Sequence, residues 1–405
     1  MRRANRSLAR LVVGGLAAAA VAVPGLVGAS STTTTTSSTT TTLGAPALPT
    51  TTTTAPAGSV GDLVCARRLV GGWAVARLAD EVVAVSIDAG HVGALGPAAH
   101  AGFGAVLVFG ERAPAAFSSV VARLQTMTPG GLEMLVMSDE EGGGVARLTN
   151  LVAAPPWAKT MGSRFDPARI RLAGERLGAS MVAAGLNVDL APVLDVDPSA
   201  AYPGRRDPDG LRSFSGVPAT VAADGTAFAQ GLAAAGVTAV AKHFPGLGGA
   251  TGNTDYGPAA TRPWPQLVGA DLAPFAAAIA AGVPAVMVAN ARVPGLTARP
   301  ASLSPVVYRY LRERMGFRGL TMTDSLSAGA ISAVGLSVPA ASVEAVAAGA
   351  DLVLAGPSPT PAAALALARA TASAIAAAVT AGDVARATLV DAAARVVATR
   401  NALSC

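Results

Sequence analysis

Residues 218–243 read PATVAADGTAFAQGLAAAGVTAVAKH, an alanine-rich stretch that leads into a short apolar run. The spacing of the apolar positions predicts a helix over 218–235, and the run over 238–243 predicts a buried strand. The same unit recurs along the chain, with another helix expected over 167–184. Eight apolar runs are present, at 82–88, 105–109, 134–139, 186–190, 238–243, 285–290, 320–324 and 351–355.

Apolar strands that alternate with helices are typical of a parallel sheet that is buried on both faces. Eight such units predict an α/β protein of the (β/α)8 TIM-barrel class, with a single catalytic domain over residues 61–405. The alternative is an open dinucleotide-binding sheet, which requires a glycine fingerprint after its first strand. The first strand is instead followed by DAGH, residues 88–91, which lacks that fingerprint.

Polar residues stand at the ends of five of these strands. In a barrel, the C-terminal ends of the strands meet at one mouth and build the active site. We therefore expect the polar residues to converge there, although any one of them taken alone could simply cap a loop. They are Asp88, Asp139, the Lys242–His243 pair, Asn290 and Asp324.

The Lys242–His243 pair stands out because lysine and histidine are rare in this chain. The only other lysine is Lys159, and the other histidines are His91 and His100. An ammonium group beside an imidazole at a strand end suits the binding of hydroxyl groups. The alternative is a chance pair on the surface.

The N-terminus reads as a secretory signal peptide over residues 1–29. Four arginines precede an apolar run over 11–27, and the small-residue cleavage pattern VGA follows at 27–29. Cleavage after Ala29 predicts a secreted or cell-envelope protein with no stable membrane insertion of the mature chain, whereas an uncleaved anchor is the alternative. Without those four arginines, 26 basic and 25 acidic residues remain, a net charge of +1, which argues against nucleic acid as a partner.

Residues 30–60 form a linker rich in Ser, Thr and Pro that cannot bury apolar surface, so we expect disorder there. It resembles a glycosylated stalk, and a bare linker is the alternative. The only two cysteines, Cys65 and Cys405, lie at the ends of the predicted barrel domain. In an oxidising compartment such a pair predicts a disulfide, with free thiols as the alternative, and it does not suggest a metal site.

The segment GFRGLTMTD, residues 316–324, resembles the nucleophile motif of glycoside hydrolase family 3, in its β-N-acetylhexosaminidase branch. Five further segments resemble motifs of that family, in the family's order. They are SDEEGGGVARL (138–148), GLNVDLAPVLDV (185–196), RSFSG (212–216), KHFPG (242–246) and GADLVL (349–354).

The resemblance implies a nucleophilic role for Asp324, which would attack the anomeric carbon of a terminal sugar. Basic neighbours are expected to keep this carboxylate ionised. The residues implied to hold the sugar are Asp139, Arg147, Arg212, Lys242 and His243. A structural ion pair is the alternative for the two arginines, and Glu141 is expected to be a structural acceptor.

The chain departs from the family pattern in the loop after the fifth strand, where a histidine normally serves as acid/base. Counting from Lys242, Asp255 occupies that position, and a carboxylic acid can take over the role if its pKa is raised. The glycine-rich loop would let Asp255 swing in and out. Gly144, Leu247 and Asn290 also replace family residues.

These observations predict a retaining exo-glycosidase that removes terminal β-linked N-acetylhexosamine, with N-acetylglucosamine as the expected sugar, from cell-wall-type glycans. We expect a monomer that acts on a carbohydrate without metal or organic cofactor. One alternative is a β-glucosidase-type hydrolase of the same family. The other is a catalytically silent barrel that binds envelope sugars, although such a barrel has no need of Asp324.

Overall fold

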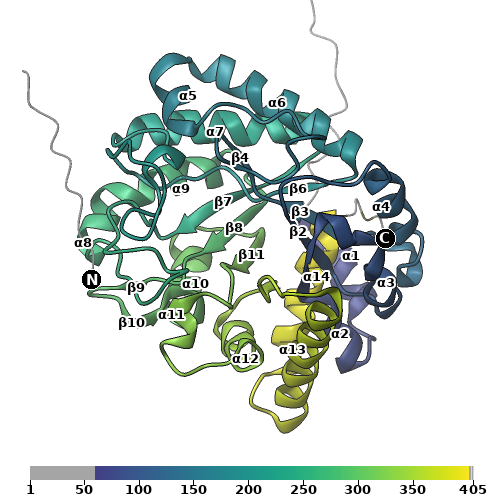
Figure 1. Ribbon diagram of the computed structural model, residues 1–405. Helices are drawn as coiled ribbons and strands as arrows, with labels where there is room; N and C mark the ends of the chain where they lie inside the picture. The colour runs from purple at the N-terminus through teal and green to yellow at the C-terminus, as the bar shows by residue number, and fades with distance from the viewer. Residues whose placement is uncertain (1–59, 401–402, 404) are drawn as a thin grey trace, which may run out of the picture. The chain divides into compact units, whose positions relative to one another are not determined.

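The computed structural model describes residues 60–400, 403 and 405, which form a parallel eight-stranded barrel surrounded by helices (Figure 1). Neighbouring strands follow the order β11-β8-β7-β6-β3-β2-β1-β12. A parallel bridge between Met322 and Leu352 brings β12 back beside β11 and closes the ring. The strands are β1 (Val83–Asp88), β2 (Ala105–Phe109), β3 (Leu135–Ser138), β6 (Val188–Asp189), β7 (Thr238–Phe244), β8 (Ala285–Val288), β11 (Leu320–Thr323) and β12 (Val353–Leu354).

The predicted (β/α)8 barrel is confirmed, and all eight strands fall on the eight predicted apolar runs. The strands are mostly apolar on both faces, because one face fills the barrel and the other packs against the helices. Along β2, Leu107 belongs to an inner cluster that draws residues from every strand, whereas Val106 and Val108 belong to the outer cluster. This alternation explains why the runs are continuous in sequence.

The helices lie around the barrel, and those predicted at 167–184 and 218–235 are α6 (Pro167–Ala184) and α7 (Pro218–Ala234). Asp166 caps α6 by accepting a hydrogen bond from the Arg169 N–H, and Gly185 ends the helix at a φ of 90°. The others are α1 (Val60–Val70), α2 (Val75–Glu81), α3 (Gly96–Ala101), α4 (Phe117–Gln125), α5 (Ala158–Arg164), α8 (Trp264–Gln266), α9 (Leu272–Ala280), α10 (Pro305–Arg309), α11 (Gly329–Ser332), α12 (Val338–Ala348), α13 (Pro361–Ala381) and α14 (Arg386–Arg400).

Two short hairpins, β4 (Glu140–Gly142) with β5 (Val145–Ala146) and β9 (Arg292–Val293) with β10 (Thr297–Pro300), follow β3 and β8. Within the described part of the chain, α13 alone is long and apolar enough to cross a membrane by length and composition. It packs against α2, α12 and β1, with Ala368, Ala372 and Ile375 buried. Its apolar character is therefore that of a helix covering the barrel.

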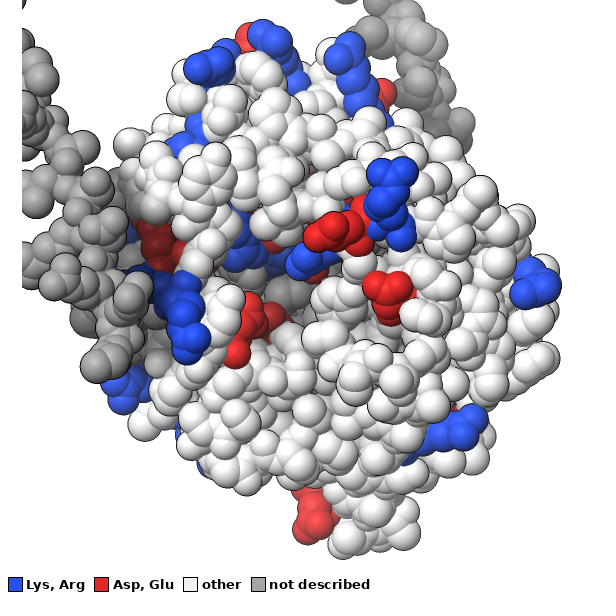
Figure 2. Space-filling view, viewed as in Figure 1, with Lys and Arg blue, Asp and Glu red and all other residues white. Residues whose placement is uncertain are grey.

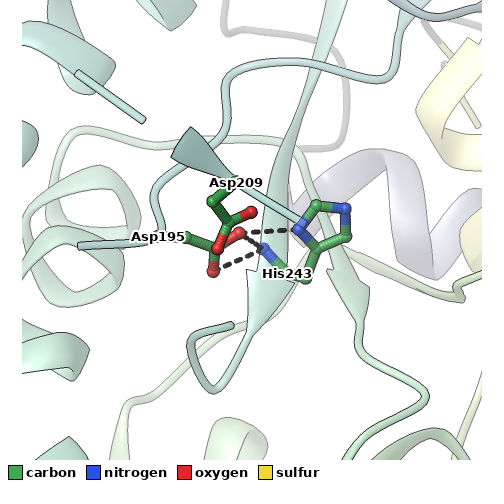
Figure 3. A group of neighbouring side chains, drawn as sticks. All are labelled: Asp195, Asp209 and His243. Carbon is green, nitrogen blue, oxygen red and sulfur yellow. Dashed lines mark hydrogen bonds and ion pairs between the residues drawn. The ribbon is translucent and has the colours of Figure 1, made fainter. Parts of the chain in front are cut away.

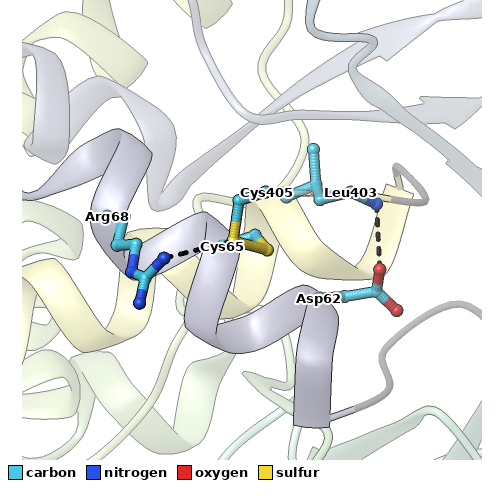
Figure 4. Close-up of a disulfide and its surroundings, with 5 residues drawn as sticks. All are labelled: Asp62, Cys65, Arg68, Leu403 and Cys405. Carbon is cyan, nitrogen blue, oxygen red and sulfur yellow. Dashed lines mark hydrogen bonds between the residues drawn. A yellow bond between two sulfur atoms is a disulfide. The ribbon is translucent and has the colours of Figure 1, made fainter.

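The two ends of the described domain meet where α1 packs against α14. Cys65 on α1 and Cys405 form a disulfide, with their Cα atoms 5.5 Å apart (Figure 4). Beside it, the Leu403 N–H donates to Asp62 Oδ1 at 2.9 Å. The predicted signal peptide over 1–29 and the linker over 30–60 lie outside the described residues, apart from Val60 at the start of α1.

Candidate active site

A cavity of about 470 Å³ opens at the C-terminal ends of the strands. In Figure 2, acidic and basic side chains gather around a hollow near the middle of the face shown. Leu107, Leu190, Met287 and Leu354 of the inner cluster form its apolar lining. All seven residues predicted for catalysis and sugar binding line this one cavity: Asp139, Arg147, Arg212, Lys242, His243, Asp255 and Asp324.

A buried ion-pair network forms one wall of the cavity. The Lys242 Nζ atom lies 2.7 Å from both Asp139 Oδ1 and Glu141 Oε1. Arg212 donates to both oxygens of Glu141, from Nε at 2.8 Å and from Nη2 at 2.7 Å. Burial alone would raise the pKa of Glu141, but Arg212 and Lys242 outweigh it and hold that pKa far below its ordinary value. Glu141 is therefore a fixed anion that orients the two cations, as expected of a structural acceptor.

The two arginines differ in how much of their hydrogen-bonding capacity is already used. Arg212 also donates from Nη1 to the Pro208 carbonyl oxygen at 2.8 Å. Most of its contacts are therefore those of a structural ion pair, which was the alternative to sugar binding. Arg147 has a side chain that is 38% exposed, and its Nη2 lies 3.9 Å from Asp139 Oδ2, beyond hydrogen-bonding distance. Arg147 consequently has donors available for a ligand.

His243 is fixed by Asp195, which follows β6. Asp195 Oδ2 lies 2.7 Å from the imidazole Nδ1. Burial, followed by the charge of Arg212, lowers the pKa of His243 to about 4, so the ring is neutral near pH 7. Since the carboxylate accepts at Nδ1, the ring proton lies there and Nε2 is the acceptor, with Arg212 Nη2 at 3.5 Å from it. A neutral imidazole of this kind can accept the proton of a sugar hydroxyl.

Asp324 follows β11 and is half-buried in the cavity wall. Its Oδ1 atom accepts a hydrogen bond from the Ser325 N–H at 2.7 Å. Burial raises the pKa of Asp324, His243 and Lys242 act in the opposite direction, and Asp255 raises it further. The basic neighbours therefore favour the ionised form of Asp324, as expected, but burial has the larger effect on its pKa.

Asp255 is exposed and lines the same cavity. Its charge contributes to the raised pKa of Asp324, which lines the same cavity. Two carboxyl groups beside one sugar site are the requirement for glycoside hydrolysis. The structure thus brings together the predicted nucleophile and the predicted acid/base.

The loop that carries Asp255 is tied down on both sides. The Asn253 N–H donates to the Arg205 carbonyl oxygen at 2.9 Å, and the Arg205 guanidinium lies 4.5 Å from the centre of the Tyr256 ring. On the other side, the Gly329 N–H at the start of α11 donates to the Asp255 carbonyl oxygen at 3.0 Å. These contacts fix the backbone around Asp255, and a swing of the predicted kind would have to break them.

Gly329 is needed for this approach. A Cβ atom there would lie 2.7 Å from the Gly257 nitrogen and 3.0 Å from the Asp255 carbonyl oxygen. Side chains do not fit at such distances without moving the loop.

Two of the strand-end residues do not reach the cavity, which corrects the expectation that all of them converge. Asp88 is exposed and caps the turn after β1, accepting from the Gly90 N–H at 2.8 Å. Asn290 is buried in the wall, donates from Nδ2 to the Ser325 carbonyl oxygen at 2.7 Å and accepts from Ser302 Oγ at 2.6 Å. Asn290 therefore supports the segment after Asp324 without meeting a ligand.

The sequence did not predict an individual role for three residues of the site: Asp195, Asp209 and Tyr256. Asp195 lies in a quoted motif and ends an apolar stretch, a signal that could have been used. Asp209 and Tyr256 lie in irregular loops, where no periodicity indicates which side chains turn inward.

Among the described residues, one group could hold a metal ion, formed by Asp195, Asp209 and His243. Each offers one ligand atom, and these atoms lie within 4.8 Å of one another (Figure 3). Both oxygens of Asp195 already accept hydrogen bonds from N–H groups, so the donor set is largely occupied by the protein itself.

Comparison with known proteins identifies the family. The model of the "Glycosyl hydrolase family 3 N terminal domain" matches residues 97–399. The chain is 38% identical over 236 residues to the beta-hexosaminidase LpqI of Mycobacterium tuberculosis, which covers 56% of this chain and 59% of LpqI. It is 33% identical over 263 residues to a beta-hexosaminidase of Methylococcus capsulatus, covering 63% of this chain and 76% of that protein. The chain thus aligns with little more than half of the mycobacterial relative's length.

Solved structures of the same family share the fold. A family 3 glycosyl hydrolase from Mycobacterium smegmatis has a TM-score of 0.71 and 32% identity, covering 81% of this chain and 97% of that one. A beta-N-acetylhexosaminidase from Beutenbergia cavernae has a TM-score of 0.70 and 31% identity, with coverages of 81% and 98%. With its family model, its relatives and the barrel-mouth cavity in agreement, the chain belongs to glycosyl hydrolase family 3.

Proposed function

We propose that this protein is a retaining exo-glycosidase that hydrolyses terminal β-linked N-acetylhexosamine, with N-acetylglucosamine as the sugar, in cell-wall-type glycans. The observation that carries the proposal is the meeting of Asp324 and Asp255 in one cavity that is also lined by Lys242, Arg147 and His243. The names of the aligned relatives support the N-acetylhexosamine class.

In the first step, the Asp324 carboxylate attacks the anomeric carbon while Asp255 gives a proton to the departing oxygen. The glycosidic bond breaks, and a covalent glycosyl–Asp324 ester forms. In the second step, Asp255 takes a proton from water, which attacks the same carbon and releases Asp324. Two displacements at one carbon retain the β configuration of the sugar.

The remaining residues hold the sugar during both steps. Asp139 accepts from hydroxyl groups, Lys242 and Arg147 donate to them, and neutral His243 accepts at Nε2. The network around Glu141 keeps these groups in place before the sugar arrives, so little reorganisation is needed on binding.

The test uses purified protein with an aryl β-N-acetylglucosaminide and the matching aryl β-glucoside. We expect kcat/KM to be higher on the first by about 10²-fold or more, because a site that hydrogen-bonds the acetamido group of its substrate would leave those partners unpaired with a glucoside. Proton NMR of the first product should show the β anomer before mutarotation. Preference for the glucoside, an α product, or sugar binding without turnover would each contradict the proposal.

We also propose that the protein is exported, is cleaved after Ala29 and acts as a monomer. The Cys65–Cys405 disulfide supports export, because such bonds persist in oxidising compartments. N-terminal sequencing of protein from the envelope or medium should begin at Ser30, and light scattering should give the mass of one chain. A chain that retains Met1, or a stable dimer, would contradict these proposals.

A further inference from the structure

Asp209 is buried without a partner that would explain its charge. It immediately precedes the turn η3 (Gly210–Arg212), has no exposed surface, and neither of its carboxylate oxygens has a hydrogen-bond partner. The closest cation is the Arg212 guanidinium, whose Nη1 lies 4.0 Å from Oδ1, beyond hydrogen-bonding distance. A buried carboxylate in this state is costly, whereas a buried carboxylic acid is much less so.

Asp195, the neighbour of Asp209, is in the opposite situation (Figure 3). It accepts from the His243 N–H at 3.2 Å, from the Leu247 N–H at 2.6 Å, and at the His243 Nδ1 at 2.7 Å. These donors favour the ionised form of Asp195, although burial has the larger effect and raises the pKa of Asp195 to about 6. Two carboxyl groups this close cannot easily both be ionised, so one proton belongs to the pair, and Asp209 is the member without donors.

We propose that Asp209 is held as a neutral carboxylic acid whose O–H donates to Asp195, and that Asp209 thereby acts as a positioning residue for His243. The part that concerns sugar binding rests on the proposed function, since His243 acts there by accepting a hydroxyl proton.

The charged groups around Asp209 favour this state. Burial raises its pKa well above the ordinary value, Asp195 and Asp197 add to the shift, and Arg212 and His243 oppose it without cancelling it. Lys159, on α5, also interacts electrostatically with Asp209, which raises the pKa of Lys159. Burial has the larger effect on Lys159 and lowers its pKa.

The neutral state matters for His243. One negative charge behind the ring, on Asp195, is enough to hold the proton on Nδ1. A second charge on Asp209 would stabilise the imidazolium form, which carries protons on both nitrogens and cannot accept at Nε2.

A divalent cation is the competing occupant of this cluster, and the contacts disfavour it. It would have to displace N–H donors from both oxygens of Asp195 and lie near the Arg212 guanidinium. A proton on Asp209 neutralises its charge and leaves both the N–H donors to Asp195 and the Arg212 guanidinium in place.

The first test compares the melting temperatures of the wild type and Asp209→Asn between pH 5 and pH 8, with full-length disulfide-bonded protein. A carboxyl group whose pKa is higher in the folded state than the unfolded value of about 3.9 gives stability that is lost as pH rises. Asparagine does not titrate, so the melting temperature of the variant relative to the wild type should increase steadily with pH. A flat difference for Asp209→Asn would overturn the proposal.

The second test does not require that variant to fold. His91→Gln with His100→Gln leaves His243 as the only histidine of the sequence, so nitrogen NMR reports its ring alone. We expect a neutral ring with its proton on Nδ1 throughout pH 5.5–8. An imidazolium signal at pH 6 would overturn the proposal, and this result does not depend on whether the protein cleaves hexosaminides.

The third test separates the proton from a metal and from a merely structural role. Adding Ca²⁺ or Zn²⁺ after EDTA treatment should not change the melting temperature of the wild type, and a rise that Asp209→Asn abolishes would establish a cation site instead. Asp209→Asn keeps an N–H donor for Asp195 and should retain KM within about twofold. Asp209→Ala should raise KM about tenfold, the worth of one hydrogen bond. Equal KM values for the two variants would contradict the donor role.

Discussion

At the C-terminal end of the barrel, Glu141 is held by Arg212 and Lys242, and at the N-terminal end Asp351 is held by Arg312 and Arg395. Both acids are buried, and both are bound by two cations. Asp351 also accepts from the N–H and the hydroxyl of Thr321, at 2.8 Å each, so the protein itself satisfies it.

The surroundings of the two networks differ. The network at the C-terminal end borders the cavity of about 470 Å³, whose lining includes Asp139, Asp255 and Asp324. Arg395, of the network at the N-terminal end, borders a cavity of about 250 Å³. This cavity has no carboxylate among its described lining residues. The same ion-pair chemistry therefore closes the barrel at one end and prepares a binding site at the other.

The largest expected effect is that of Asp324→Ala, which tests whether the C-terminal end of the barrel holds the catalytic nucleophile. Removing the nucleophile should lower kcat on aryl β-N-acetylglucosaminide by about 10⁵-fold or more. Because burial raises the pKa of Asp324, the melting temperature should stay the same or increase. Asp88→Ala is the matched control, since Asp88 also ends a barrel strand but lies outside the cavity, and it should retain full activity. Retention of more than a few per cent of kcat by Asp324→Ala would show that another group is the nucleophile.

Asp255→Ala should separate two substrates by their leaving groups. With a poor leaving group, the rate should fall by about 10²–10⁴-fold, the usual contribution of a general acid. With a good leaving group, which departs without a proton, the first step should be almost unchanged in a stopped-flow assay. Equal losses on both substrates would mean that Asp255 acts through the loop structure, and no loss on either would move the acid elsewhere.

A pair of isosteric variants tests the comparison of the two ends directly. Asp351→Asn leaves two arginines without their anion and should lower the free energy of unfolding by about 3–5 kcal/mol. Its kcat/KM should be nearly unchanged at temperatures below that at which the variant unfolds. Asp139→Asn leaves Lys242 paired with Glu141, so stability should change little. Its kcat/KM should fall about 10- to 100-fold through a lost charged hydrogen bond to the sugar. Chemical denaturation and steady-state kinetics on both variants measure this, and a stability loss at Asp139 equal to that at Asp351 would abolish the distinction.

The smallest expected effect on catalysis comes from the disulfide, whose two cysteines are not among the residues that line the cavity. Replacing both Cys65 and Cys405 by Ser should lower the unfolding free energy by about 2–4 kcal/mol, since the bond limits the unfolded chain. The value of kcat should stay within about twofold of the wild type at 25 °C. Unchanged stability, or two free thiols in exported protein, would show that the bridge does not form.

The barrel and the membership of the site could be predicted because they depend on patterns along the chain. Continuous apolar runs follow from burial on both strand faces, and motif residues such as Asp139 and Lys242 follow strands whose ends must meet. The direction of a side chain does not follow from this rule, so Asp88, which caps a turn, and Asn290, which turns into the wall, were misplaced.

The electrostatics of the site were less accessible from sequence. Neighbouring cations can be read from motifs, but the depth of burial cannot, and burial decides the direction of the pKa shift of Asp324. Asp209 lies in the irregular segment before η3, and only its lack of hydrogen-bond donors in three dimensions makes it notable.

The most direct test of the central claim, that Asp324 and Asp255 share the chemistry in one cavity, is to trap the covalent intermediate. A 5-fluoro N-acetylglucosaminyl fluoride slows both steps but leaves with a good leaving group, so a glycosyl–enzyme ester should accumulate. Mass spectrometry of peptic peptides should place one sugar on Asp324, and Asp255→Ala should still acquire the label but lose it more slowly. A label on another carboxylate, or turnover of the reagent with no covalent species, would contradict the account.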